Sequence, residues 1–144
     1  MKTNRMSISI AKIFNIILLV IIMTGCKNNV QNKQYKIGIL CGLDYLANLE
    51  IGFKSKMIEL GYEEGKNITY YFHRTNFEPE KERQILMQFI EDKVDLILSY
   101  PTEVTMAAKE TVQGTNIPVI FAVANVEKTN LIEHIQKPGG NITG

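Results

Sequence analysis

Residues 94–114 read VDLILSYPTEVTMAAKETVQG, and this stretch indicates the fold. Its first part, residues 94–100, is mostly apolar, as expected for a strand in a parallel sheet that is covered on both faces. The residues from Thr102 onward favour a helix that follows the strand directly. A strand followed at once by a helix is the unit from which α/β sheets are built.

The same alternation continues on both sides of this stretch. Further strands are predicted at residues 35–41, 67–73 and 117–124, and further helices at residues 46–61, 78–93 and 130–137. Two helices show an inward face at three- and four-residue steps, formed by Leu46, Leu49, Phe53, Met57 and Leu60 in the first and by Ile85, Leu86, Phe89 and Ile90 in the second. Strict alternation predicts an α/β fold, with an open parallel sheet and helices on both faces.

The amino-terminal residues 1–25 are predicted to be a signal peptide. They begin with basic residues, contain no acidic one, and include an apolar run at residues 13–23 that is shorter than a membrane-spanning helix needs. The sequence MTGC at residues 23–26 resembles the lipobox of bacterial lipoproteins, so Cys26 is a candidate for lipidation. The alternative is an ordinary buried or free cysteine. Residues 26–34 are polar and are interpreted as a flexible tether.

Composition and spacing exclude several classes of function. The chain has 16 basic and 15 acidic residues, and this near-neutral balance gives no reason to expect nucleic-acid binding. His73 and His134 have no cysteine or carboxylate at metal-ligand spacing, so neither a metal nor another cofactor is predicted. Cys41 would have only Cys26 as a partner, and no internal disulfide is expected. Because no Gly-x-Ser-x-Gly motif is present, the chain is not predicted to be an enzyme.

Candidate ligand-binding residues are those just after predicted strands, because ligands of open α/β sheets bind beyond the carboxyl ends of the strands. After the first, third and fourth strands these residues are Gly42, Asp44, Tyr45, Ser99, Tyr100, Thr102 and Asn125. Ser99, at a strand end, is open to either a structural or a ligand-binding role.

Several of the candidates have two interpretations. Thr102 could cap the following helix by accepting a hydrogen bond from an N–H two or three residues later, and uncapped N–H groups there would attract a ligand carboxylate. Asp44 could pair with a ligand ammonium group or begin a helix. Tyr45 and Tyr100 could stack on an aromatic ligand or be partly exposed loop residues. Asn125 could bind a ligand or close a turn.

Five stretches occur in one order across residues 35–144: KIGIL, GFKSKMIELGYEEGKNITY, VDLILSYPT, IPVIFAV and KPGGNITG. Together they resemble the substrate-binding lipoproteins of ABC transporters, in the group associated with tryptophan and other aromatic amino acids. The resemblance implies a lobe of the type I periplasmic-binding-protein kind with a flavodoxin-like strand order. It also implies an amino acid or other small-molecule solute, and a permease and an ATPase as partners. The sequence departs from the family pattern at Glu103, where proline is common, and at Asn125-Val126, where Asp-Pro is frequent.

The resemblance also implies two lobes that enclose the ligand between them. Residues 35–137 are then expected to be the first lobe, and residues 138–144 to begin the crossover to a second lobe that this sequence lacks. The alternative is a self-sufficient protein of one lobe. The expected location is the outer face of the bacterial cytoplasmic membrane, held there by a lipid on Cys26. The alternative function is an extracytoplasmic sensory domain that reports to a membrane kinase or another partner.

Overall fold

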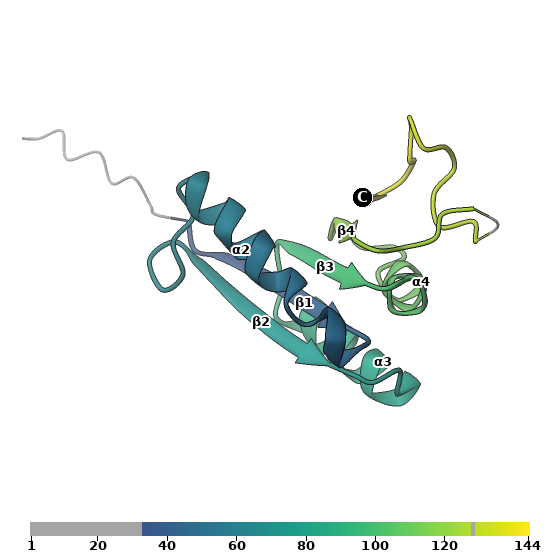
Figure 1. Cartoon of the computed structure of the whole chain (residues 1–144), viewed down its shortest axis with the longest axis horizontal. Coiled ribbons are helices and arrows are strands. Elements are labelled where there is room, and N and C mark those ends of the chain that lie inside the picture. Colours follow the sequence, from purple (N-terminus) through teal and green to yellow (C-terminus); the bar gives the residue numbers. More distant parts are fainter. Residues whose placement is uncertain (1–32, 128) are drawn as a thin grey trace, which may run out of the picture. The chain divides into compact units, whose positions relative to one another are not determined.

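Five parallel strands form a single sheet in the order β2-β1-β3-β4-β5 (Figure 1). The computed structural model describes residues 33–127 and 129–144. The strands are β1 (Tyr35–Cys41), β2 (Ile68–Arg74), β3 (Leu96–Tyr100), β4 (Val119–Phe121) and β5 (Ile142–Thr143). Because the chain runs from β1 to β2 on one side and then to β3 on the other, the strand order reverses at β1. The flavodoxin-like order expected from the sequence is therefore confirmed.

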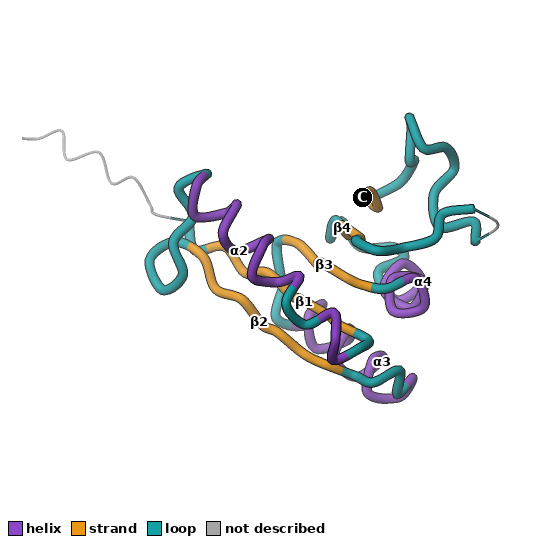
Figure 2. The backbone as a smooth tube through the Cα atoms, viewed as in Figure 1, coloured by secondary structure: helices purple, strands orange, loops and turns teal. Residues whose placement is uncertain are grey.

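The helices lie on both faces of this sheet, as predicted (Figure 2). A short 3-10 helix, η1 (Asp44–Leu46), precedes α2 (Leu49–Glu59), and the later helices are α3 (Pro79–Glu91) and α4 (Thr102–Thr111). α2 packs on one face through Phe53 and Met57. α3 and α4 pack on the other face. Within the described part of the chain, none of the helices is long and apolar enough to cross a membrane.

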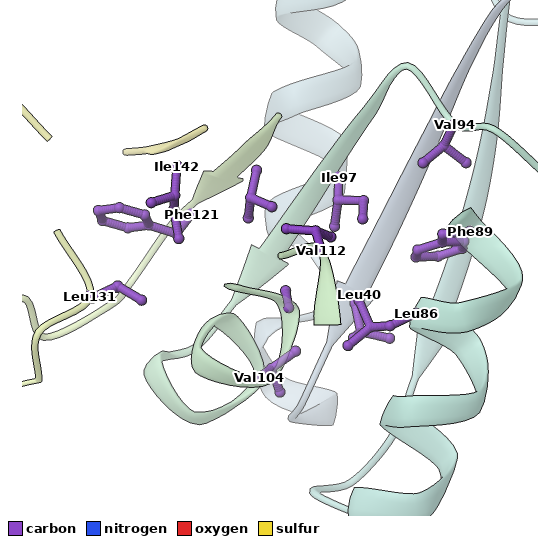
Figure 3. Packing of buried hydrophobic residues seen from close by; sticks show 12 residues of the cluster. Leu40, Leu86, Phe89, Val94, Ile97, Val104, Val112, Phe121, Leu131 and Ile142 are labelled. Atoms are coloured by element: carbon purple, nitrogen blue, oxygen red, sulfur yellow. The ribbon is translucent and has the colours of Figure 1, made fainter. Parts of the chain in front are cut away.

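Side chains of the strands alternate between the two faces with a period of two residues. In β1, Ile37 and Ile39 join the cluster under α2, whereas Leu40 joins the cluster under α3 and α4 (Figure 3). At Gly38 an added Cβ would face the cluster under α3 and α4 and would lie 2.6 Å from Cδ2 of Phe89. The missing side chain at this position lets the Phe89 ring pack directly against the strand.

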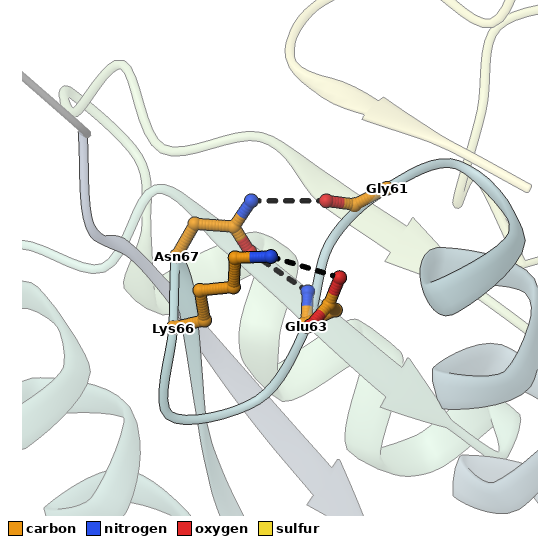
Figure 4. A network of polar contacts seen from close by, with 4 residues as sticks. All are labelled: Gly61, Glu63, Lys66 and Asn67. Carbon is orange, nitrogen blue, oxygen red and sulfur yellow. Dashed lines mark hydrogen bonds and ion pairs between the residues drawn. The ribbon is translucent and has the colours of Figure 1, made fainter. Parts of the chain in front are cut away.

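The turn between α2 and β2 is closed by the side chain of Asn67 (Figure 4). Its Nδ2 donates to the carbonyl of Gly61 at 2.9 Å, and its Oδ1 accepts from the N–H of Glu63 at 2.8 Å. Lys66 Nζ reaches Oε1 of Glu63 at 3.1 Å. Gly61 and Gly65 adopt φ values of 88° and 80°, where a side chain would be strained. The GYEEGKN segment is thus a polar clasp, here called the Asn67 clasp, that fixes how β2 follows α2.

Asp95 ties together the amino ends of β1 and β3, at the same end of the sheet as the Asn67 clasp. Its carboxylate accepts the N–H of Lys36 at 2.9 Å and lies 2.7 Å from Nζ of Lys33. Partial burial raises the pKa of Asp95, but the hydrogen bonds from Lys33 and Lys36 outweigh this effect and leave the pKa lowered. The chain therefore enters the fold through a charged contact at the edge away from the strand carboxyl ends.

The helix predicted at residues 130–137 is wrong. This segment forms bends and an isolated bridge between His134 and Lys137, and the N–H of Glu133 donates to the carbonyl of Pro138 at 2.9 Å. Leu131 is buried, but Ile135, which would share its helical face, is 77% exposed. The chain turns back on itself here, so the two apolar residues that a helix would place on one face lie in different environments, one buried and one exposed.

Other boundaries also differ from the prediction. β4 covers only part of the predicted residues 117–124, since Pro118 precedes it and Val123 takes a left-handed φ of 54°. Leu49 and Leu60, predicted to face inward, are exposed. Residues 142–143 of the predicted crossover are strand β5 of this sheet. The signal peptide, Cys26 and most of the predicted tether lie outside the described residues.

Candidate functional site

The carboxyl ends of the parallel strands meet at one edge of the sheet, here called the strand-end edge. β1, β2, β3 and β4 end there, at Cys41, Arg74, Tyr100 and Phe121. Two backbone hydrogen bonds hold the loops together: Gly42 N–H donates to the carbonyl of Tyr100 at 2.9 Å, and Thr75 N–H donates to the carbonyl of Cys41 at 3.0 Å. Since the strand order reverses at β1, this edge is where an open α/β sheet binds its ligand.

Gly42 is buried at this edge between two other elements. An added Cβ would lie 2.6 Å from Cγ2 of Val104 in α4 and 2.7 Å from Cε1 of Phe77 in the loop after β2. The absence of a side chain at residue 42 therefore lets Phe77 and α4 approach the end of β1. Gly42 shapes the strand-end edge through packing.

Asp44 and Tyr45 lie in η1, directly beyond β1. The Asp44 carboxylate pairs with Nη1 of Arg74 at 3.2 Å, and both side chains are more than half exposed. The Tyr45 side chain is 77% exposed. Both side chains are exposed, so a ligand could reach them. Asp44 already has a cationic partner, Arg74, at the end of the neighbouring strand.

Ser99 and Tyr100 are fully buried at the end of β3. Ser99 Oγ donates to Oγ1 of Thr105 at 3.1 Å, on the face covered by α4. Tyr100 points to the opposite face, where its hydroxyl lies near the weakly polar thiol of Cys41 and has no stronger hydrogen-bond partner among the described residues. Burial is the main cause that raises the pKa of Tyr100 above its usual range. In this conformation both residues belong to the core beneath the edge.

The predicted cap by Thr102 is wrong. α4 begins at Thr102 itself, Pro101 occupies the cap position, and no side chain caps the helix. Thr102 Oγ1 instead accepts the N–H of Asn125 at 2.8 Å, which joins the loops after β3 and β4. Asn125 Oδ1 accepts the N–H of Glu127 at 3.0 Å, so the turn interpretation of Asn125 is present in the structure. The helix cap fails because the helix starts one residue earlier than a capping threonine requires.

Three residues at the strand-end edge were missed by sequence reasoning: Arg74, Phe77 and Val123. Phe77 and Val123 have left-handed φ values of 58° and 54°, and both are exposed. Together with Tyr45 they place an exposed apolar side chain on the loops after β2, β4 and β1. The sequence could have indicated Arg74 and Phe77, because they follow the second predicted strand as directly as Asp44 follows the first.

Two surface hollows lie outside the predicted residues. One of about 590 Å³ is lined by residues 126–127 and 132–136, and one of about 480 Å³ lies between α4 and residues 129–131. Neither is lined by Gly42, Asp44 or Thr102. The predicted site is thus an edge of the sheet and is separate from these hollows.

Comparison with known proteins identifies the family. The family described as ABC transporter substrate binding protein matches residues 22–144. The chain belongs to this family. The resemblance read from the sequence is therefore confirmed.

Individual members agree with this assignment. The chain is 29% identical over 143 residues to a tyrosine-binding protein from Clostridioides difficile (strain R20291), covering 89% of this chain and 41% of that protein. A substrate-binding protein with adhesive properties from Clostridium difficile, solved in a ligand-free, open form, matches with a TM-score of 0.70 and 26% identity over 76% of this chain and 38% of that one.

A more distant structure supports the fold alone. The ABC domain from Streptococcus pneumonia in complex with L-Trp matches with a TM-score of 0.70 and 24% identity, covering 78% of this chain and 38% of that chain. The chain spans about two fifths of the length of the relatives described here.

Proposed function

We propose that residues 35–144 contribute one wall of an amino-acid site in the extracytoplasmic solute-binding component of an ABC importer. The observation that carries the proposal is the strand-end edge, where charged and exposed apolar side chains from three loops gather in a chain of the substrate-binding family. An amino acid is the favoured solute because it combines charged groups with a side chain. The names of two relatives, one tyrosine-binding and one in complex with L-Trp, support this class.

A single wall is proposed because the strand-end edge is open. A bound solute would need a second surface opposite Tyr45, Phe77 and Val123 to cover its other side, and closure of two lobes about a hinge would supply it. Residues 35–137 would be the first lobe, and residues 138–144, which add β5 to its sheet, would also begin the connection to the second. The part-length coverage of the relatives supports this arrangement.

Two features of the edge are candidates for holding a ligand carboxylate. The first is the amino end of α4, which no side chain caps, so its N–H groups and helix dipole favour an anion. Glu103 lies in the first turn of this helix and opposes an anion there. The second is Arg74, whose guanidinium is exposed beside β1.

The proposal places the protein outside the cell, held on the cytoplasmic membrane by a lipid on Cys26, where it delivers solute to a permease and its ATPase. Acyl-chain burial would supply roughly 0.8 kcal/mol for each buried methylene. Membrane fractionation of the expressed chain tests this part. We expect the wild type in the membrane fraction and a Cys26→Ser variant in the soluble fraction; unchanged fractionation of the variant contradicts the lipid anchor.

Titration calorimetry with L-tyrosine and L-tryptophan tests the one-wall proposal. Since one wall buries only part of the solute, we expect no affinity tighter than about 1 mM, which corresponds to roughly −4.1 kcal/mol. Micromolar binding by this chain alone would show that the site is complete without a second lobe. The weak binding that the proposal predicts is measured by NMR, as described below.

A further inference from the structure

We propose that Arg74 and Asp44 together bind the backbone charges of a free amino acid, with Arg74 holding its carboxylate and Asp44 its ammonium group. This inference rests on the proposed function, since it names how that site recognises its solute. The two residues come from neighbouring strand ends. Arg74 is the last residue of β2 and lies opposite Cys41 in the register of β1 and β2, and Asp44 begins η1 just beyond Cys41.

The contact between the two side chains leaves most of their binding capacity unused. A single pair of atoms, Nη1 of Arg74 and Oδ1 of Asp44, lies at 3.2 Å. A guanidinium has five N–H donors, and a carboxylate can accept about four hydrogen bonds. No other hydrogen bond to either side chain is formed among residues 33–127 and 129–144. The pair can therefore accept a further anion and a further cation without losing an existing partner.

The exposure of the pair argues against a mainly structural role. The side chains of Arg74 and Asp44 are 53% and 69% exposed. Ion pairs this exposed contribute little to folding stability, because water screens the charges and two long side chains must be ordered. The same exposure makes both charges accessible to a solute.

A free amino acid matches this arrangement in charge and spacing. Its carboxylate and ammonium group lie on one carbon, so docking beside the pair would place each ligand charge next to an opposite charge of the protein. The planar guanidinium can bind a carboxylate through two parallel N–H donors. The guanidinium carbon of Arg74 also lies over the ring of Phe72, 6.0 Å from the ring centroid, and this contact restricts the positions that the guanidinium takes.

The surroundings of the pair favour an aromatic side chain on the ligand. Tyr45 directly follows Asp44 in η1, and its side chain is 77% exposed. An amino acid held by its charges at Arg74 and Asp44 would thus find an exposed aromatic ring on the loop after β1. This differs from capture at the amino end of α4, where Glu103 opposes the carboxylate.

Two-dimensional ¹⁵N NMR of the chain with three matched ligands tests the proposal. L-Phenylalanine carries both charges, phenethylamine only the ammonium group, and 3-phenylpropionate only the carboxylate. We expect L-phenylalanine to shift the Arg74 Nε–H signal and the backbone N–H signals of Asp44 and Tyr45 with a Kd of a few millimolar, and each analogue to bind about tenfold more weakly.

Three variants assign the two charges. Arg74→Gln should weaken L-phenylalanine and 3-phenylpropionate about tenfold and leave phenethylamine unchanged. Asp44→Asn should weaken L-phenylalanine and phenethylamine and leave 3-phenylpropionate unchanged. The control is Arg83→Gln, because Arg83 forms a comparable exposed pair with Glu80 at 3.4 Å on α3. This control should bind all three ligands as the wild type does.

The outcomes separate this inference from the proposed function. If L-phenylalanine shifts the N–H signals of Thr102 and Asn125 with equal affinity in wild type and Arg74→Gln, the edge binds the solute but the Arg74–Asp44 assignment is overturned. If Arg74→Gln weakens all three ligands equally and also lowers the urea midpoint, the pair is a structural latch, which overturns the assignment too. Absence of any strand-end shift at about 50 mM ligand contradicts both proposals.

Discussion

Removal of the Asn67 side chain should destabilise the fold by about 2 kcal/mol, because it breaks both hydrogen bonds of the Asn67 clasp. These bonds have lengths of 2.8 and 2.9 Å and reach Glu63 and Gly61. A typical intramolecular hydrogen bond contributes about 0.5–1.5 kcal/mol net, so two contribute about 1–3 kcal/mol. The loss falls on the segment that fixes β2, an edge strand paired only with β1.

Urea unfolding followed by circular dichroism measures this effect. We expect Asn67→Ala to lower the midpoint without changing the slope, which would indicate lost stability in an otherwise similar fold. In thermal unfolding the same variant should melt roughly 8 °C below the wild type. The matched control is Asn116→Ala, since Asn116 is exposed and its side chain forms no hydrogen bond within the described residues. It should unfold like the wild type.

Substitution by aspartate separates the two bonds of the clasp. Asn67→Asp keeps an oxygen that can accept the N–H of Glu63, but it replaces the donor to Gly61 with a second oxygen. At neutral pH this variant should be at least as unstable as Asn67→Ala. Below about pH 4 the protonated acid can donate again, and the difference from wild type should shrink. A loss below about 0.5 kcal/mol for Asn67→Ala would refute the clasp as a stabilising element.

Three further predictions concern stability, each measured by urea unfolding. Gly42→Ala should cost about 1–3 kcal/mol, since its Cβ would overlap Val104 and Phe77; an unchanged midpoint would show that these groups move freely. Tyr100→Phe should stabilise by about 1 kcal/mol, because the buried hydroxyl has only the weakly polar Cys41 thiol beside it among the described residues; a loss would show that the hydroxyl is bound to that thiol or to a water. Asp95→Asn should be less stable than wild type at pH 7. Because the pKa of Asp95 is lowered by Lys33 and Lys36 once partial burial is overcome, this deficit should vanish as the pH falls below about 4, and a pH-independent deficit would contradict it.

The core of the fold could be predicted from the sequence because local pattern and tertiary structure agree there. The apolar run at residues 94–100 is strand β3 with the turn before it, and the predicted helix follows it as α4, although Thr102 is its first residue and not its cap. The segment at residues 130–137 could not be predicted in this way. Its helical appearance depends on Leu131 and Ile135 sharing a buried face, and only the tertiary structure decides that Ile135 stays exposed.

The candidate site was predictable in position but only partly in detail. Period-two alternation places Ser99 and Tyr100 on opposite faces, but the sequence does not say that both faces are covered as far as the strand end. The pairing of Arg74 with Asp44 depends on the register of β1 against β2, which joins residues 30 apart in sequence. Such a register is set by packing of the whole sheet and cannot be predicted from either strand alone.

Loops at the strand-end edge hold strained backbone conformations. Among the described residues with side chains, left-handed φ values occur at Asn76, Phe77 and Val123 on this edge, and elsewhere at Lys93 and Asn130; a β-branched valine in that region is strained. Such conformations cost about 1–3 kcal/mol each and persist only where surrounding structure enforces them. Here the enforcement comes from the packing of Phe77 on Gly42 and from the Thr102–Asn125 hydrogen bond, which closes the loop after Val123. The fold therefore holds two exposed apolar side chains, those of Phe77 and Val123, in strained loops at the strand-end edge. This arrangement lowers stability, and capture of a solute gives a reason for it.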